Sequence, residues 1–254
     1  MTTPFLVVIP ARMASTRLPR KPLSLIGGLP MIVRVAQQAK KSAASRVIIA
    51  TDSDEIVAVA HEHQLEVLLT KSSHPTGTDR LSEVAHQLGL PPDEIVVNVQ
   101  GDEPFIPPEI INEVANTLAN HPKSHLATAA IAISNEEEIH NPNVVKVVLN
   151  QQGCAMYFSR AVIPFTRDPQ LITNDTFRYL RHIGIYAYKA SFLQEFSLLL
   201  PAPPEKLEAL EQLRALWYGY SIQVFISKEA PPPGVDTPED LAHAQAIWEK
   251  LNVR

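Results

Sequence analysis

Residues 5–21 read FLVVIPARMASTRLPRK and join two different kinds of sequence. The first part, FLVVI, is entirely apolar, which is typical of a strand buried on both faces. The rest is rich in basic and hydroxyl side chains and is bounded by prolines. A buried strand that runs directly into a polar loop indicates an α/β protein whose ligand lies at the carboxyl edge of a parallel sheet.

The first half of the chain alternates short apolar runs with amphipathic helical patterns. Strands are predicted at residues 5–9, 46–50, 66–69 and 94–99. Helices are predicted at residues 30–41, 54–63 and 108–120, together with one whose apolar face is formed by residues 81, 84, 85 and 88. Repeated β-α-β units predict an α/β fold with a mostly parallel central sheet and helices on both faces.

The pattern changes after about residue 124. Close-spaced strands are predicted at residues 126–133, 144–149, 154–158 and 180–189. A helical region at residues 207–218, a strand at 221–226 and a C-terminal helix ending near residue 251 complete the chain. We therefore expect a nucleotide-binding α/β domain formed by residues 1–123 and 191–254, with a mixed-sheet insertion at residues 124–190.

Composition excludes several classes of protein. The formal net charge of −5 argues against a general nucleic-acid binder, which carries a basic surplus. Cys154 is the only cysteine, so an intrachain disulfide and a cysteine-rich zinc site are excluded. The apolar runs are too short for a signal peptide or a membrane span. We expect a cytoplasmic protein that binds neither nucleic acid nor membrane.

The loop after the first strand concentrates positive charge. It lacks both the GxGxxG dinucleotide fingerprint and the GxxxxGK[ST] P-loop. Its cations and hydroxyls are Arg12, Ser15, Thr16, Arg17, Arg20 and Lys21. Arginine forks and a lysine ammonium suit a triphosphate, whose charges must be neutralised at close range. A solvated basic loop would have the same composition, but the position of this one at the sheet edge favours phosphate binding.

Two aspartates are candidate metal ligands. Asp102 follows the strand at residues 94–99, so it emerges at the same sheet edge as the basic loop. Asp236 precedes the C-terminal helix, in which Thr237 fits as N-cap and Asp240 as the partner in a capping box. Mg²⁺ prefers one or two carboxylates completed by phosphate oxygens and water. Alternatively, Asp102 marks a turn, and Asp236 favours the helix N-terminus by about 0.3–1 kcal/mol.

Other polar residues allow two interpretations each. Arg80 lies in the first turn of a helix that follows Thr76 and Gly77, where it would reach a base or phosphate, although a plain helix cap fits equally well. His182 and Tyr186 share one face of a strand and, with Arg160, would suit a carboxylated and hydroxylated substrate. His182 also fits a hydrogen-bonded interior histidine. Glu211 and Gln212 border an apolar stripe, so they are solvent-facing unless a pocket lies beside them.

Several segments in one order resemble the 3-deoxy-manno-octulosonate (Kdo) cytidylyltransferases, the CMP-Kdo synthetases of Gram-negative bacteria. The first, IPARMASTRLPRKPL at residues 9–23, is shared by sugar nucleotidyltransferases in general. The more specific segments are VNVQGDEPFIP at 97–107, LRHIGIYAY at 180–188, LEQLRALWYG at 210–219 and GVDTPEDL at 234–241. The resemblance extends through nearly the whole chain and implies a Rossmann-like, GT-A-like nucleotidyltransferase fold.

The resemblance also implies an activity and a set of site residues. The enzyme would transfer CMP from CTP to Kdo, releasing pyrophosphate and activating Kdo for lipopolysaccharide biosynthesis. CTP would bind Ala11, Arg12, Ser15, Lys21, Arg80 and Gln100. Mg²⁺ would be held by Asp102 and Asp236, which with Lys21 and Arg12 form the catalytic set. Kdo would bind Arg160, His182, Tyr186, Glu211 and Gln212. Family members are usually homodimers, with the mixed-sheet region at the interface.

One position departs from the family, and three other functions compete. Relatives commonly have glycine where this chain has Arg20, and glycine permits a positive φ that arginine tolerates poorly. The placement of Lys21 therefore depends on the path of this loop. The competing functions are a cytidylyltransferase for sialic acid or an amino analogue of Kdo, a metal-dependent glycosyltransferase, and a catalytically silent nucleotide-binding protein.

Overall fold

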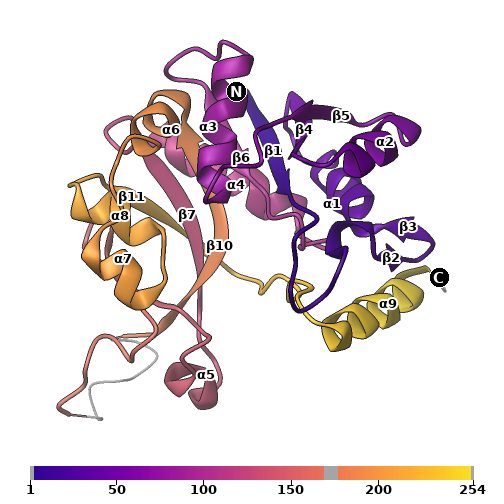
Figure 1. The fold of residues 1–254 in the computed structure, drawn as a ribbon. Helices are drawn as coiled ribbons and strands as arrows, with labels where there is room; N and C mark the ends of the chain where they lie inside the picture. The colour runs from indigo at the N-terminus through magenta and orange to yellow at the C-terminus, as the bar shows by residue number, and fades with distance from the viewer. Residues whose placement is uncertain (1–2, 169–176, 253–254) are drawn as a thin grey trace.

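A single mixed sheet runs through the computed structural model, which describes residues 3–168 and 177–252. Its strand order is β11-β7-β10-β6-β1-β4-β5. The N-terminal half of the chain supplies one side of this order: β1 (Phe5–Ala11), β4 (Arg46–Thr51), β5 (Glu66–Leu69) and β6 (Ile95–Asn98). These four strands are parallel, with β1 between β4 and β6. The predicted parallel sheet is confirmed (Figure 1).

The rest of the sheet comes from the second half of the chain. Its strands are β7 (Leu126–Ala132), β8 (Lys146–Leu149), β9 (Ala155–Ser159), β10 (Leu180–Lys189) and β11 (Ile222–Ser227). β10 is antiparallel to both neighbours and lies between β6 and β7, whereas β11 is parallel to β7. Two strands of the predicted insertion thus lie in the central sheet, and β8 and β9 extend from β10. The division into residues 124–190 and the remainder stays a prediction.

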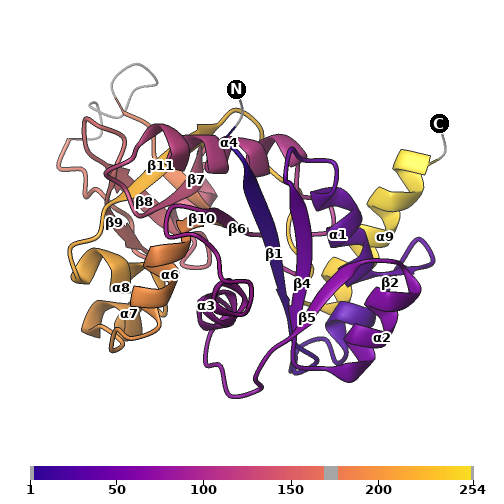
Figure 2. The ribbon, with the colours of Figure 1, turned by 90° about the horizontal axis from the view of Figure 1, so that it is seen from above.

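Helices cover both faces of the sheet (Figure 2). One face packs against α1 (Met31–Ala39), α2 (Asp54–Glu62), α4 (Pro108–Asn120) and α9 (Pro238–Asn252). The other packs against α3 (Gly77–Gln87), α6 (Ala190–Phe196) and α8 (Gln212–Trp217), with α7 (Pro203–Glu208) beside α8. Side chains alternate along β1, so Val7 enters the first core and Val8 the second.

Several local elements differ from the predictions. The helical region expected at 207–218 is two short helices, α7 and α8, because Ala209 between them has φ 51° and cannot continue a helix. A short hairpin, β2 (Leu25–Ile26) and β3 (Leu29–Pro30), follows the 3₁₀ turn η1 (Lys21–Leu23). α5 (Glu136–His140) and α6 were not predicted, because both are short. Within the described ranges, no helix has the length and hydropathy needed to cross a membrane.

Candidate active site

Lys21 lies between the two aspartates that were predicted as metal ligands. Its Nζ donates to Asp102 Oδ2 at 2.6 Å and to Asp236 Oδ1 at 2.9 Å. Arg17 donates from Nη2 to the other oxygen of Asp236 at 3.0 Å. Segments from the start, middle and end of the chain thus meet at one point of the sheet edge. The two carboxylates thus converge on a single cation, the Lys21 ammonium.

Backbone contacts fix the two aspartates relative to each other. Asp102 follows β6 through Gly101, where a Cβ atom would lie 2.8 Å from the carbonyl oxygen of Pro10, so only glycine allows this approach. The amide of Val235 donates to the carbonyl oxygen of Asp102 at 2.8 Å. This bond joins the residue before Asp236 directly to the first aspartate.

The capping box predicted at the start of α9 is present. Asp240 N donates to Thr237 Oγ1 at 3.2 Å, and Asp240 Oδ2 accepts from Thr237 N at 2.9 Å. Asp240 also accepts from the amide of Asp236 at 3.1 Å. The Asp236 carboxylate is not used in the cap, and it turns toward Lys21 and Arg17, as the sequence indicated.

The Asp102 carboxylate acts to raise the pKa of two nearby groups, Lys21 and Glu103. Burial acts to lower the pKa of Lys21, but the carboxylates of Asp102 and Asp236 outweigh it and hold that pKa above its ordinary value. Burial, with a smaller contribution from the Asp102 charge, raises the pKa of Glu103 to about 7. The site therefore holds Lys21 firmly protonated beside a carboxyl group that resists ionisation.

Arg20 adopts the left-handed conformation that glycine would favour, with φ 57° and ψ 29°. Its guanidinium pairs with the carboxylate of Glu55 at the start of α2. The loop therefore keeps the path that a glycine would allow, and Lys21 reaches both aspartates. The departure from the family pattern does not displace the lysine.

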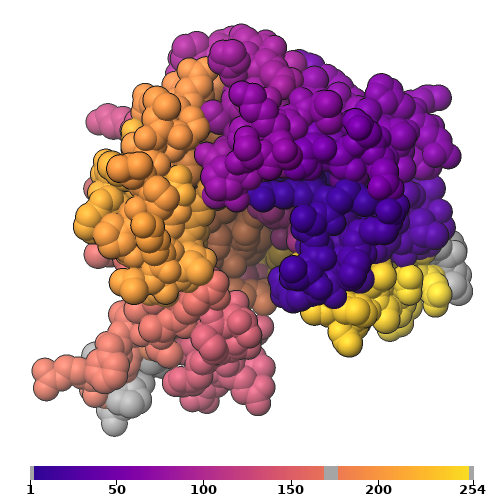
Figure 3. Space-filling view, viewed as in Figure 1, coloured from indigo at the N-terminus to yellow at the C-terminus, as the bar shows by residue number. Residues whose placement is uncertain are grey.

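Some of the other residues predicted to bind the nucleotide, namely Ala11, Arg12 and Gln100, line a pocket together with Lys21. A pocket of about 190 Å³ is lined by Ala11, Arg12, Lys21, Gln100 and Asp102, among others. Arg12 donates from Nη2 to the carbonyl oxygen of Pro75 at 3.2 Å, and Ser15 Oγ accepts from Leu18 N at 3.3 Å. Figure 3 shows the surface hollowed between this N-terminal region and helices α7 and α8.

Arg80 does not reach this pocket. Its side chain is fully buried, with one Nη donating to Asp52 Oδ2 at 3.1 Å and the other to Thr70 Oγ1. Its Nε has no hydrogen-bond partner among the described residues. Thr76 and Asp79 form the capping box that was the alternative interpretation of this segment. Direct binding of CTP by Arg80 stays a prediction.

His182 and Tyr186 lie on one face of β10 as predicted, with ring centroids 5.4 Å apart. A bulge between Ile183 and Tyr186 breaks the register with β7, and the hydroxyl of Thr128 lies 2.9 Å from His182 Nε2. The His182 ring meets Phe158 edge-on. Desolvation lowers the pKa of His182 to about 3, so the imidazole is neutral. The interior-histidine interpretation therefore fits the structure.

Glu211 links the start of α3 to a cavity beside β10. Its Oε2 accepts from Thr78 Oγ1 at 2.9 Å, and its Oε1 is buried without a partner in the described part of the chain. Desolvation by burial raises the pKa of Glu211. Glu211, Gln212, Tyr186, Tyr188 and Thr78 line a cavity of about 60 Å³. Glu211 and Gln212 are therefore pocket residues rather than solvent-facing ones.

Arg160 is held by a network of backbone and carboxylate contacts. Its Nε donates to Glu208 O at 2.7 Å, and its amide donates to Glu208 Oε2 at 2.9 Å. The buried ammonium of Lys146 donates to the Arg160 carbonyl oxygen at 2.7 Å. Arg160 directly follows β9, whose Phe158 touches His182, so the structure brings the predicted sugar-binding residues to one region.

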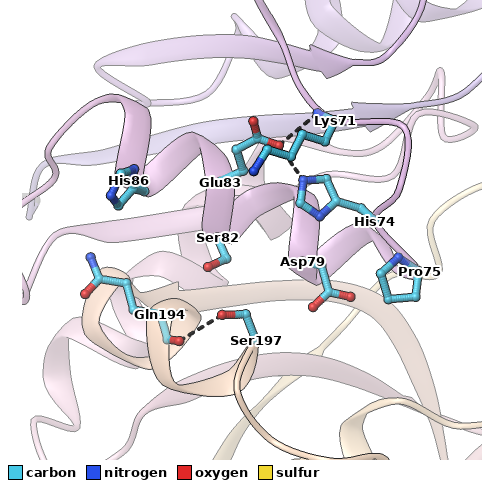
Figure 4. Close-up of a pocket in the computed structure, with 9 residues that line it drawn as sticks. All are labelled: Lys71, His74, Pro75, Asp79, Ser82, Glu83, His86, Gln194 and Ser197. Carbon is cyan, nitrogen blue, oxygen red and sulfur yellow. Dashed lines mark hydrogen bonds and ion pairs between the residues drawn. The ribbon is translucent and has the colours of Figure 1, made fainter.

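A larger pocket of about 600 Å³ lies between α3 and α6, outside the predicted set (Figure 4). The ring of His74 and the amide of Lys71 both contact the Glu83 carboxylate. Burial alone would raise the pKa of Glu83, but these hydrogen bonds lower it. The contacts anchor the loop that carries Pro75, the acceptor of the Arg12 hydrogen bond.

Several supporting residues were not predicted as site residues. They are Thr78, Lys146 and Glu208. Lys146 and Glu208 make contacts between distant segments, which no spacing in the sequence reveals. Thr78, in contrast, lies in the segment that was singled out for Arg80, and its hydroxyl at the start of a helix was a usable signal.

Known proteins resemble this chain in both sequence and fold. A family model described as Cytidylyltransferase matches residues 6–223. Relatives from Polynucleobacter necessarius subsp. necessarius and Polynucleobacter asymbioticus, both named 3-deoxy-manno-octulosonate cytidylyltransferase, are 61% and 62% identical over 96% of this chain and 95% of their own. A structure of CMP:2-keto-3-deoxy-manno-octonic acid synthetase complexed with CTP is 39% identical, covers 98% of this chain and 100% of its own, and has a TM-score of 0.90. The chain therefore belongs to the 3-deoxy-manno-octulosonate cytidylyltransferase family.

Proposed function

We propose that the protein transfers the cytidylyl group of CTP to the anomeric hydroxyl of Kdo, giving CMP-Kdo and pyrophosphate. The observation that carries the proposal is the meeting of Lys21, Asp102 and Asp236 beside the pocket lined by Arg12 and Gln100. The name shared by the two Polynucleobacter relatives supports Kdo as the acceptor. The CTP in the solved neighbour supports the donor.

We further propose that Mg²⁺ is held by Asp102 and Asp236. The donor set fits this ion, because both groups are hard carboxylate oxygens that converge on one cation, and triphosphate oxygens with water would complete the coordination. The described residues contain no cluster of three or more His, Cys, Asp or Glu side chains suited to a metal. A bound Mg²⁺ would neutralise phosphate charge and favour the ionised form of the attacking hydroxyl.

In this proposal the residues of the protein orient the reactants and neutralise charge. The hydroxyl oxygen of the sugar forms a bond to the α-phosphorus while the bond between that phosphorus and the β-phosphate oxygen breaks, and the hydroxyl proton leaves to solvent. Lys21 and Arg12 would hold the triphosphate and stabilise the departing pyrophosphate. In-line positioning lowers the barrier, so no dedicated protein base is needed.

The residues predicted to bind Kdo lie beside β10, on what we call the sugar side of the cleft. They would select the acceptor by hydrogen bonding. Glu211 offers an oxygen that has no hydrogen-bond partner in the described ranges, and Gln212 and Tyr186 line the same cavity, which suits a hydroxylated substrate. Arg160 would meet the carboxylate of a sugar acid. A site built from buried polar groups rejects ligands that leave those groups unpaired.

We also propose that the protein forms a homodimer through residues 124–190. β9 pairs only with β8 among the described strands, and its side chains Met156 and Tyr157 are 61% and 38% exposed. Phe165 nearby in sequence is 83% exposed. Light scattering after size-exclusion chromatography tests the proposal, and a monomeric mass at micromolar concentration contradicts it.

Pyrophosphate release from CTP and Mg²⁺ is the direct test of the activity. We expect release with Kdo and little with sialic acid or the amino analogue of Kdo. Release with another sugar acid alone would replace Kdo as the acceptor. Transfer from a nucleotide sugar without consumption of CTP would indicate a glycosyltransferase instead.

A further inference from the structure

The far end of α9 is attached to the hairpin that follows Lys21. α9 begins at Pro238, directly after Asp236 and Thr237, and Trp248 lies about 15 Å further along the helix axis at 1.5 Å per residue. Figure 1 shows α9 at the edge of the molecule beside β2 and β3. The contacts of Trp248 therefore help to set the direction of α9, and Asp236 lies just before the start of this helix.

Trp248 fits against a position where only glycine is possible. A Cβ atom on Gly27 would lie 1.9 Å from Trp248 Nε1, and Gly27 has a positive φ of 55°. The guanidinium carbon of Arg34 lies 3.5 Å from the centre of the indole ring. Arg34 also donates to the carbonyl oxygens of Ile26 at 2.9 Å and Gly27 at 2.6 Å. The indole thus stacks on a cation that is fixed to the hairpin.

The apolar face of α9 supplies further contacts to the core. Leu241, Ala244 and Trp248 lie on its apolar face, and Trp248 is the largest of them. Gln245 adds one hydrogen bond from Nε2 to the carbonyl oxygen of Leu25 at 3.0 Å. Loss of the indole would therefore remove the largest of these apolar contacts.

The hairpin is in turn joined to Lys21. The 3₁₀ turn Lys21–Leu23 leads directly into it, and the amide of Met31 after the hairpin donates to Ser24 O at 2.8 Å. At the other end of α9, Val235 N is bonded to Asp102 O. The hairpin and α9 thus form a closed frame around the point where Lys21 meets the two aspartates.

We propose that Gly27, Arg34 and Trp248 are positioning residues that keep Asp236 and Lys21 in register for a divalent cation and triphosphate. The inference rests on the proposed function for its kinetic test. It assigns to this distant contact a role in cation binding, and it leaves the sugar side of the cleft unaffected.

A matched pair of glycine variants tests the contact. Gly27→Ala introduces the clash with Trp248, whereas Gly28→Ala has similar backbone strain, with φ 81°, and nothing within 4 Å of its new Cβ. By analogy with outer-shell partners of metal ligands, Gly27→Ala should raise the half-saturating Mg²⁺ concentration about 10–100-fold. Gly28→Ala should leave it within about twofold of the wild type, and the KM for Kdo should change in neither variant. Equal effects of the two alanines would overturn the proposal.

Two tryptophan variants keep the test informative if Gly27→Ala fails to fold. Trp248→Ala should weaken the Mg²⁺ response, and Trp248→Phe should restore most of it, because phenylalanine keeps an aromatic face for Arg34.

Hydrogen exchange without substrates gives an independent readout. Trp248→Ala should speed exchange at residues 17–24 and 234–240 more than at residues 180–188, and uniform exchange would contradict the proposal. If Asp102→Asn also leaves activity intact, the proposed function itself fails, whereas loss with Asp102→Asn but not with Trp248→Ala rejects only this inference.

Discussion

The cleft between the N-terminal region and helices α7 and α8 has a nucleotide side, around Lys21, and a sugar side, beside β10. The two sides differ in how strongly their polar groups are charged and how far solvent reaches them. On the nucleotide side, Lys21 is paired with two carboxylates that solvent still reaches, since Asp102 and Asp236 have side chains 28% and 44% exposed. On the β10 side, Tyr186 is buried, His182 is held neutral, and desolvation raises the pKa of Glu211. The first region suits charge neutralisation and the second suits recognition by neutral hydrogen bonds. One cleft thus combines a site for a polyanion with a site for hydroxyl groups.

The contrast between the two sides would be wrong if the enzyme kept its activity after the carboxylates of the nucleotide side were neutralised. Asp102→Asn and Asp236→Asn should each reduce turnover by more than the about 10–100-fold typical of an outer-shell partner, because each removes a proposed metal ligand. Pyrophosphate release gives the rate, and thermal unfolding checks that the fold survives. Near-normal turnover in both variants would remove the metal assignment.

At acid pH, the desolvated imidazole of His182 on the sugar side should lower the stability of the folded protein. His182 has a pKa of about 3 in the folded protein and about 6.5 when unfolded, so below pH 6.5 the unfolded state binds the extra proton. Stability from this group is therefore complete above pH 6.5 and declines as the pH falls toward 3, by about 2 kcal/mol at pH 5. Urea unfolding at pH 7 and pH 5 should show a smaller pH effect in His182→Gln. The same pH dependence in both proteins would show that the ring is not desolvated.

Replacing the carboxyl group of Glu211 should affect binding of the acceptor alone. Glu211→Gln alters the hydrogen bond with Thr78 and the oxygen that has no partner among the described residues, and a cost of about 1–3 kcal/mol corresponds to a rise of about 5–150-fold in the KM for Kdo. The KM for CTP should stay within about twofold. Glu113→Gln, an exposed change in α4, is the control. An equal rise for both substrates would mean that the two sides are not separate.

Arg20 should give the smallest effect. Arg20→Gly relieves the cost of a positive φ but loses an exposed ion pair with Glu55, and each effect is about 1 kcal/mol or less. The unfolding free energy should therefore change by less than about 1 kcal/mol, with turnover within about twofold. Glu55→Gln isolates the ion pair. A large loss of turnover in Arg20→Gly would show that Arg20 acts on the charged side directly.

The sequence was most informative where a local rule determined the structure. Buried strands, the loop after β1 and the capping box before α9 follow from patterns of neighbouring residues, and they placed Lys21, Asp102 and Asp236 at one sheet edge. Long-range pairing was less predictable. The antiparallel course of β10 between β6 and β7 depends on strands far apart in the chain, and so does the burial of Arg80 against Asp52 and Thr70.

The break between α7 and α8 illustrates a different limit. Ala209 has a high helix propensity, yet it has a positive φ. Helix propensity therefore did not predict the break. The break lets Glu208 bind Arg160 while Glu211 faces Thr78. Tertiary contacts therefore override local preference at the point where the sugar side of the cleft is built.

The position of β10 has a consequence for synthesis of the chain. β6 and β7 leave the ribosome well before the strand that joins them, so each has an unpaired edge until residues 180–189 emerge. Pairs such as Asn98 with Tyr186 require closure of a long loop, which slows folding and prolongs exposure of those edges. We therefore expect the nascent chain to be most prone to aggregation during translation of residues 133–180, and to depend most on chaperones in that interval.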